Sequence, residues 1–139
     1  MFRKILVGVD GSEHGYKAAK VAGELARYMQ ADLWVVVSFE EVPRYLGDSH
    51  LQEAMTARIR EAHEILRRAQ EGIGTIPGTL TPEVLEGPPA EAILVAADVH
   101  GVDLIVMGTR GLGRLAGLLL GSQSQKVAAH AKCPVLLVR

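Results

Sequence analysis

Short apolar runs alternate along this chain with segments whose apolar residues recur every three or four positions. The runs at 5–9, 33–39, 103–107 and 135–138 are nearly continuous and rich in branched aliphatic residues, which is typical of strands buried on both faces. A further run at 80–85 is less apolar and is therefore expected near an edge of the sheet. The pattern predicts five strands.

Helices are predicted between these strands. Apolar residues step at helical spacing along 13–30 and 51–69, prolines open a helix over 88–99, and a shorter helix covers about 122–131. Strands and helices that alternate in this way favour a parallel sheet covered on both faces. We therefore expect one α/β domain over 1–139, with a doubly wound, open, five-stranded parallel sheet of the Rossmann-like kind.

Charge and composition narrow the possible partners. Fifteen basic against 16 acidic residues give a net charge of -1, which leaves no excess of positive charge for nucleic acid or an anionic membrane surface. No apolar stretch approaches the ~20 residues of a membrane span or the core of a signal peptide, so a cytoplasmic protein is expected. The only cysteine, Cys133, is expected to be a buried structural thiol.

The strand pattern also predicts where a ligand binds. In open parallel sheets, ligands lie beyond the carboxyl ends of the strands, at the point where the strand order reverses. The runs at 5–9 and 103–107 are the most apolar internal strands and are the natural central pair. The segments that leave them, 10–12 and 108–121, are therefore expected to meet at the site.

The segment 108–121 is rich in glycine and runs into a predicted helix, an arrangement suited to polyphosphate because backbone N–H groups and the helix dipole both favour anions. Two familiar motifs nearly match it. A P-loop would need Lys followed by Ser or Thr where this chain has Arg114 and Leu115. The spacing at 111–116 resembles a dinucleotide fingerprint, but no acidic residue follows Asp103 to bind a ribose. We reject both interpretations.

The pattern that does fit is Gly108-x2-Gly111-x9-Gly121-Ser122, and with it the chain resembles the ATP-binding branch of the universal stress protein family. The segments 4–12, 103–108 and 130–135 carry the same resemblance, which covers essentially the whole chain. It implies the strand order 3-2-1-4-5, in agreement with the central pair chosen from hydrophobicity. It also implies a homodimer through the edge strand 134–138, which would cover an apolar edge.

Site residues follow from the resemblance, position by position. Asp10 would accept hydrogen bonds from the ribose hydroxyls, and Ser38 occupies a position where the family reads the adenine edge, often with a His-Val pair that is Val37-Ser38 here. Arg110 and Arg114 could each reach a phosphate, and the alternative for both is an exposed, solvated arginine on the loop. The N–H groups of Gly111, Gly121, Ser122 and Gln123 and the hydroxyls of Ser122 and Ser124 would surround the phosphates. Val9 and Gly108 would complete the site.

Simpler interpretations remain open for some of these residues. Asp10 and Glu13 have the spacing of a capping box, and Ser12 can cap the same helix. The five histidines have no metal-ligand spacing and are interpreted as structural or solvated: His14, His50, His63, His100 and His130.

Mechanism is constrained by what the chemistry of phosphoryl transfer needs. No catalytic triad is recognisable, and no carboxylate beyond Asp10 is expected in the site, so a dedicated catalytic base is missing. We expect ATP binding with Mg²⁺ bridging the phosphates, slow hydrolysis at most, and a sensor or switch in which ATP orders 108–121. The alternatives are an ATP-dependent hydrolase or transferase and a scaffolding dimer without nucleotide.

Overall fold

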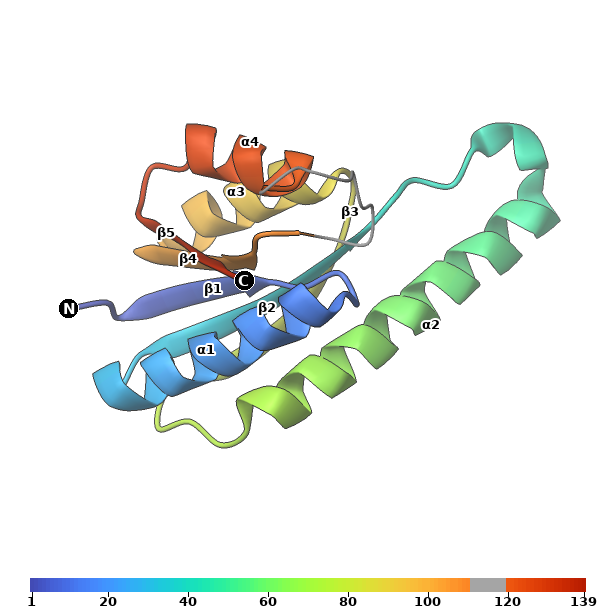
Figure 1. Cartoon of the computed structure of the whole chain (residues 1–139). Helices are drawn as coiled ribbons and strands as arrows, with labels where there is room; N and C mark the ends of the chain where they lie inside the picture. Colours follow the sequence, from blue (N-terminus) through green and yellow to red (C-terminus); the bar gives the residue numbers. More distant parts are fainter. Residues whose placement is uncertain (111–119) are drawn as a thin grey trace.

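The computed structural model describes residues 1–110 and 120–139, which form one sheet covered by helices (Figure 1). The expected strands and helices are all present, and their ends differ from the expected ones by at most a few residues. The elements are β1 (Lys4–Gly8), α1 (Glu13–Met29), β2 (Asp32–Phe39), a 3-10 turn (Arg44–Leu46), α2 (Asp48–Ile73), β3 (Leu80–Glu86), α3 (Pro89–His100), β4 (Leu104–Gly108), α4 (Ser122–His130) and β5 (Val135–Val138).

The sheet has five parallel strands in the order β3-β2-β1-β4-β5, as predicted. Ile5 of the central strand β1 pairs with Leu33 of β2 on one side and with Leu104 of β4 on the other. The weakly apolar β3 lies at one edge, and β5 lies at the opposite edge. The strand order reverses between β1 and β4, which places the expected ligand site at their carboxyl ends.

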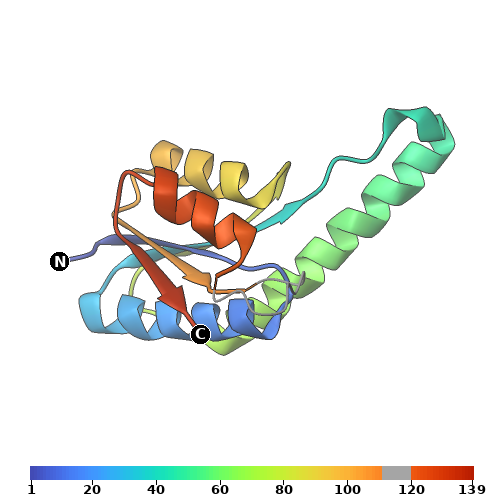
Figure 2. The ribbon, with the colours of Figure 1, turned by 45° about the horizontal axis from the view of Figure 1, so that its top comes forward.

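Helices α1 and α2 cover one face of the sheet, and α3 and α4 cover the other (Figures 1 and 2). Alternate residues of β1 enter the two cores: Ile5 and Val7 pack with α1 and α2, and Leu6 packs with α3. All three side chains are fully buried. Continuous apolar runs in the sequence therefore reflect strands that have a helical layer on each side.

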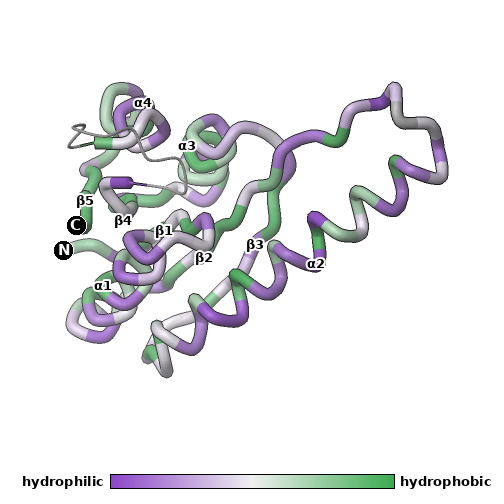
Figure 3. Tube along the Cα trace, turned by 45° about the vertical axis from the view of Figure 1, so that its right-hand side comes forward, coloured by the Kyte–Doolittle hydropathy of each residue, from purple (hydrophilic) through white to green (hydrophobic). Residues whose placement is uncertain are grey.

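Helix α2 is longer than the sheet that it crosses. Its buried residues all lie in the C-terminal part, which we call the docked half (62–73): Ala62, Leu66, Ala69 and Ile73. The N-terminal part, which we call the overhang (48–61), projects beyond the sheet (Figure 1) and carries mixed polar and apolar positions (Figure 3). Among the described residues, no helix combines the length and apolar character that crossing a membrane requires.

Candidate functional site

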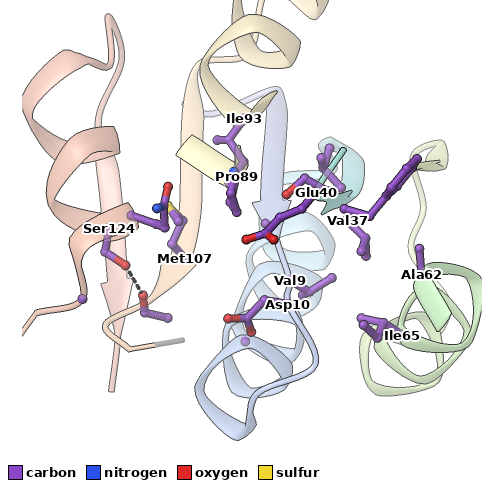
Figure 4. A pocket seen from close by; sticks show the side chains of 18 of the residues that line it. Val9, Asp10, Val37, Glu40, Ala62, Ile65, Pro89, Ile93, Met107 and Ser124 are labelled. Atoms are coloured by element: carbon purple, nitrogen blue, oxygen red, sulfur yellow. Dashed lines mark hydrogen bonds between the residues drawn. The ribbon is translucent and has the colours of Figure 1, made fainter. Parts of the chain in front are cut away.

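A cavity of about 470 Å³ opens at the carboxyl ends of β1, β2 and β4 (Figure 4). Its volume is in the range of small-molecule sites, and its position is the reversal of strand order predicted from the sequence. Residues Ala62 and Ile65 of α2 line one side, while Ser124 of α4 lies on the opposite side (Figure 4). A side with apolar residues from α2 and a polar side from α4 therefore face the same cavity.

The loop after β1 is held by its own side chains. Ser12 is the N-cap of α1, because its hydroxyl accepts a hydrogen bond from the Gly15 N–H at 3.1 Å. Asp10 Oδ1 accepts from the Ser12 N–H at 3.0 Å and from the Ser12 hydroxyl at 2.5 Å. Gly11 has a φ of +88°, which favours glycine at this turn. Asp10 therefore supports the cap through Ser12, and the capping box that we considered between Asp10 and Glu13 does not form.

The loops after β1 and β4 meet, as the sequence predicts. His14 Nδ1 lies 3.1 Å from the Thr109 hydroxyl, and the Ser12 hydroxyl lies 3.5 Å from the Arg110 carbonyl oxygen. A Cβ on Gly108 would come within 2.8 Å of the His14 backbone. Close contact with α1 is therefore enough to require glycine at position 108, whatever ligand the site holds.

The N-terminus of α4 forms the polar wall opposite α2. Gly121 is the N-cap residue, and its N–H donates to the Thr109 carbonyl oxygen at 2.7 Å. That bond uses a donor which the resemblance assigned to a phosphate. The first N–H groups of a helix have no intrahelical partner, so the remaining donors on this wall are the backbone groups of Ser122, Gln123 and Ser124.

Two side chains of α4 hold the wall in place. The Ser124 hydroxyl donates to the Gly108 carbonyl oxygen at 2.8 Å and is buried, which joins α4 to the end of β4 (Figure 4). Gln123 Oε1 accepts from the Ala90 N–H at 3.0 Å and so caps the first turn of α3. The proton of the Ser124 hydroxyl is thus engaged within the protein, and its contribution to an anion site comes from the backbone.

The opposite end of the cavity contains an apolar slot. Val9 and Val37 come from the ends of β1 and β2, and the Val9 N–H donates to the Val36 carbonyl oxygen at 2.9 Å, which continues the ladder between these strands. Ala62 and Ile65 of α2 close this end. Ser38 also lines the cavity, as expected, at the end of β2.

Most of the residues expected in the site are brought together by the fold. The cavity is lined by Val9, Asp10, Ser38, Gly108, Arg110, Gly121, Ser122, Gln123 and Ser124. Gly111 and Arg114 lie outside the described residues, as does most of the segment that we expected a nucleotide to order.

Three charged lining residues were missed by sequence reasoning: Glu40 after β2, and Arg58 and Glu61 on α2. The expectation that Asp10 is the only carboxylate in the site is therefore wrong. A signal was present, because Glu40 lies two positions beyond Ser38, at the end of a strand that was already assigned to the site. The contribution of α2 had no such signal, since it depends on the angle at which the helix crosses the sheet.

Other candidate chemical groups lie away from the cavity. His100 stacks on Trp34 with ring centroids 4.9 Å apart, and its Nε2 contacts a carboxylate oxygen of Glu83. Cys133 is partly exposed rather than fully buried. The partial burial of its thiol raises the pKa of that group, which disfavours the reactive thiolate. Within the described residues, no group of three or more His, Cys, Asp or Glu side chains is placed to hold a metal ion.

Comparison with known proteins matches the chain to the model of the "Universal stress protein family" over residues 1–139. A Thermus aquaticus protein described as "Universal stress protein in QAH/OAS sulfhydrylase 3'region" is 50% identical over 139 residues, which cover 100% of both chains.

Solved structures share the fold. The universal stress protein UspA from Lactobacillus plantarum superposes with a TM-score of 0.88 at 29% identity and covers 99% of this chain and 98% of its own. A universal stress protein in complex with cAMP has a TM-score of 0.78 at 27% identity, with 99% and 97% coverage.

Proposed function

The chain belongs to the universal stress protein family, and we propose that it binds an adenine nucleotide, with ATP as the first candidate, in the cavity at the ends of β1, β2 and β4. One observation carries the proposal: a helix N-terminus, a carboxylate and an apolar slot surround one cavity of about 470 Å³. These features match the phosphates, the ribose and the base of one molecule.

The anion end of the site fits phosphate chemistry. Backbone N–H groups at the start of α4 lie at the positive end of the helix dipole, and Arg110, which follows β4, lines the same cavity. Amide donors and a cation stabilise phosphate oxygens without any covalent chemistry. A family member bound to cAMP, a nucleotide with a single phosphate, supports a site of this kind.

The carboxylate of Asp10 fits a ribose. Its Oδ1 accepts two hydrogen bonds from Ser12, which orient the carboxylate at the centre of the cavity (Figure 4). An ionised carboxylate is an acceptor only, so it pairs with the hydroxyl donors of a diol. Support of the cap and ribose binding are therefore compatible roles for the same side chain.

Regulation, rather than rapid turnover, is the role that we propose. The carboxylates other than Asp10 that line the cavity do not come from α4: Glu40 follows β2, and Glu61 lies on α2. Phosphoryl transfer needs a positioned nucleophile close to the phosphates. We expect Mg²⁺ to be held chiefly by the phosphates, because no described cluster of metal-binding side chains accompanies the site. ATP-dependent hydrolysis or transfer is the alternative.

A homodimer through β5 is part of the proposal. Leu136 of this edge strand is 37% exposed, and an apolar edge strand stays liable to pair with another strand until it is covered. A second copy that pairs along β5 would cover it. Sedimentation at micromolar concentration should report a dimer, and a monomer would contradict this part of the proposal.

The first experiment identifies the nucleotide that copurifies with the protein, by denaturation followed by chromatography and mass analysis. ATP near one per chain would support tight binding and slow turnover, whereas ADP or AMP would favour the hydrolase. An empty protein that also ignores added ATP and Mg²⁺ would contradict the nucleotide site and favour a scaffolding dimer.

A substitution sharpens this test. Asp10→Asn keeps the Oδ1 acceptor that holds Ser12 but removes the charge and one acceptor oxygen, so ATP affinity should fall about tenfold while the fold persists. Glu13→Gln is the matched control, because it makes the same charge change on an exposed residue that does not line the cavity. Equal affinities for the two variants, measured by calorimetry, would argue against a ribose contact.

A further inference from the structure

We propose that Glu40 selects the base of the bound nucleotide by accepting a hydrogen bond from its exocyclic amine, which favours 6-aminopurines over 6-oxopurines. The inference rests on the proposed function, because it assigns one residue of the same cavity. Glu40 belongs neither to the glycine-rich segment nor to the loop after β1.

The shape of the cavity determines which end receives the base. Amide donors of α4 lie on one side, and the Asp10 carboxylate lies between them and the apolar slot (Figure 4). The slot is formed by Val9, Val37 and Ile65, together with Ala62. A nucleotide with its phosphates at α4 and its ribose at Asp10 therefore places the flat base in this slot.

Glu40 is positioned at the edge of the slot by the end of the sheet. It directly follows Phe39, the last residue of β2, whose carbonyl oxygen accepts a hydrogen bond from the Gly87 N–H at 2.8 Å. This bond ties the chain to β3 just before Glu40. The side chain then turns back, and its carboxylate points into the cavity (Figure 4).

The carboxylate of Glu40 is available for a ligand. It forms no ion pair with any lysine or arginine in the described parts of the chain, whereas Glu64, Glu71 and Asp98 all do. Arg58 and Glu61 of α2 line the same side of the cavity, so the local charge is mixed rather than uniformly acidic. An ionised carboxylate without an ion-pair partner at a pocket mouth accepts hydrogen bonds and repels other acceptors.

Purine bases differ in the group that they would present to Glu40. At position 6, adenine carries an amino group, which is a donor, and hypoxanthine carries an oxo group, which is an acceptor; at N1 the pattern is reversed, so the expected preference belongs to a contact of Glu40 with position 6. Glu40 is exposed at the cavity, so water can satisfy its carboxylate when the wrong base is bound, and the discrimination comes from the lost hydrogen bond and from setting two acceptors against each other. We therefore expect wild-type protein to bind ATP more tightly than ITP by about tenfold.

The test compares ATP with ITP for three proteins: wild type, Glu40→Gln and Glu41→Gln. Glutamine at position 40 can accept from an amine or donate to an oxo group, so the ATP-to-ITP affinity ratio should fall to within about threefold of unity. Glu41→Gln removes the same charge from the next residue, which is exposed and does not line the cavity, so its ratio should stay that of the wild type.

Ratios measured by calorimetry separate base recognition from general electrostatics. Loss of one negative charge strengthens binding of both triphosphates alike, and this common effect cancels in the ratio. AMP and IMP should give the same ratio as ATP and ITP, because they differ in the same group of the base. Thermal melting of the variants confirms that they are folded.

The outcomes are distinct. A ratio that collapses in Glu40→Gln alone supports the assignment. A wild-type protein that binds ATP and ITP equally, a ratio unchanged in Glu40→Gln, or tighter binding of GTP than of ATP overturns it and leaves the nucleotide site intact. A protein that binds none of these nucleotides at millimolar concentration overturns the proposed function, and the role of Glu40 with it.

Discussion

The two halves of α2 follow the same helical pattern but have different surroundings. In the docked half, Leu66 is 3% exposed and packs between the sheet and α1. In the overhang, Leu51 and Met55 continue the same stripe yet remain only half-buried, because the helix has passed the end of the sheet. A periodic stripe therefore predicts that a helix forms, but it does not predict how much of that helix is covered.

The overhang nevertheless takes part in the candidate site. Arg58 and Glu61 lie near its C-terminal end and line the cavity, next to the first buried residue of the docked half, Ala62. Stability is thus concentrated in the docked half, while the overhang supplies polar groups at the mouth of the site. Segments with few buried contacts are also those that open most easily and that ligands can order.

The largest expected difference between the halves is in stability. Leu66→Ala should lower the free energy of unfolding by about 2–5 kcal/mol, because it removes a buried side chain from a packed core. Met55→Ala should cost less than about 1 kcal/mol, because its side chain is half-exposed. Chemical denaturation followed by circular dichroism measures both, and comparable losses would show that the overhang belongs to the cooperative core.

A second prediction concerns ligand binding. Amide hydrogens of 48–61 should exchange faster than those of 62–73 in the free protein, and saturating ATP should slow exchange in the overhang, by up to about a hundredfold at 100 times Kd. Arg58 and Glu61 of the overhang line the cavity, so a bound nucleotide would lie against the overhang. Mass spectrometry of peptides from each half reads out the effect, and a distant segment such as β5 serves as the reference.

If ATP binds and exchange in the overhang is unchanged, the overhang is only a passive wall of the site. Protection confined to 48–61 would instead identify it as a surface that can report nucleotide occupancy to a partner.

The smallest effect is expected from surface charge on the docked half. A hydrogen bond from Arg67 holds the pKa of the Glu64 carboxyl below its usual range. A depressed pKa stabilises the folded state above the ordinary carboxyl pKa, and this contribution is lost as pH falls through the depressed value. Both side chains are more than half exposed, so the contribution to stability is slight.

Arg67→Ala should therefore return the pKa of Glu64 toward its ordinary value, as measured by NMR titration, with little change in thermal stability. A marked drop in stability would show that this exposed pair matters more than its exposure indicates.

Much of the candidate site could be predicted from the chain because it lies where strands end. Asp10 and Ser38 follow apolar runs, and the glycine-rich segment follows a third, so parallel topology brings them to one edge. Detailed roles could not be predicted. The N–H of Gly121 bonds to Thr109, and the hydroxyl of Ser124 bonds to Gly108, because loops that meet satisfy their own polar groups first.

The role of Glu40 could not be predicted from the sequence either. Its position in the sequence places it just past β2, but only the tertiary structure shows that its carboxylate points into the cavity (Figure 4). The residues of α2 that line the cavity had no sequence signal, because their presence there depends on how the helix packs on the sheet.

The alternation of apolar runs and helical stripes was sufficient to specify five parallel strands, two helical layers and the edge at which the candidate site lies, because each depends on periodicity and on the rules of chain connection. Tertiary structure alone decided where α2 leaves the sheet, which loop donors are already used and which carboxylates face the cavity. Those features depend on packing angles and contacts between residues far apart in the chain, and no local pattern encodes them.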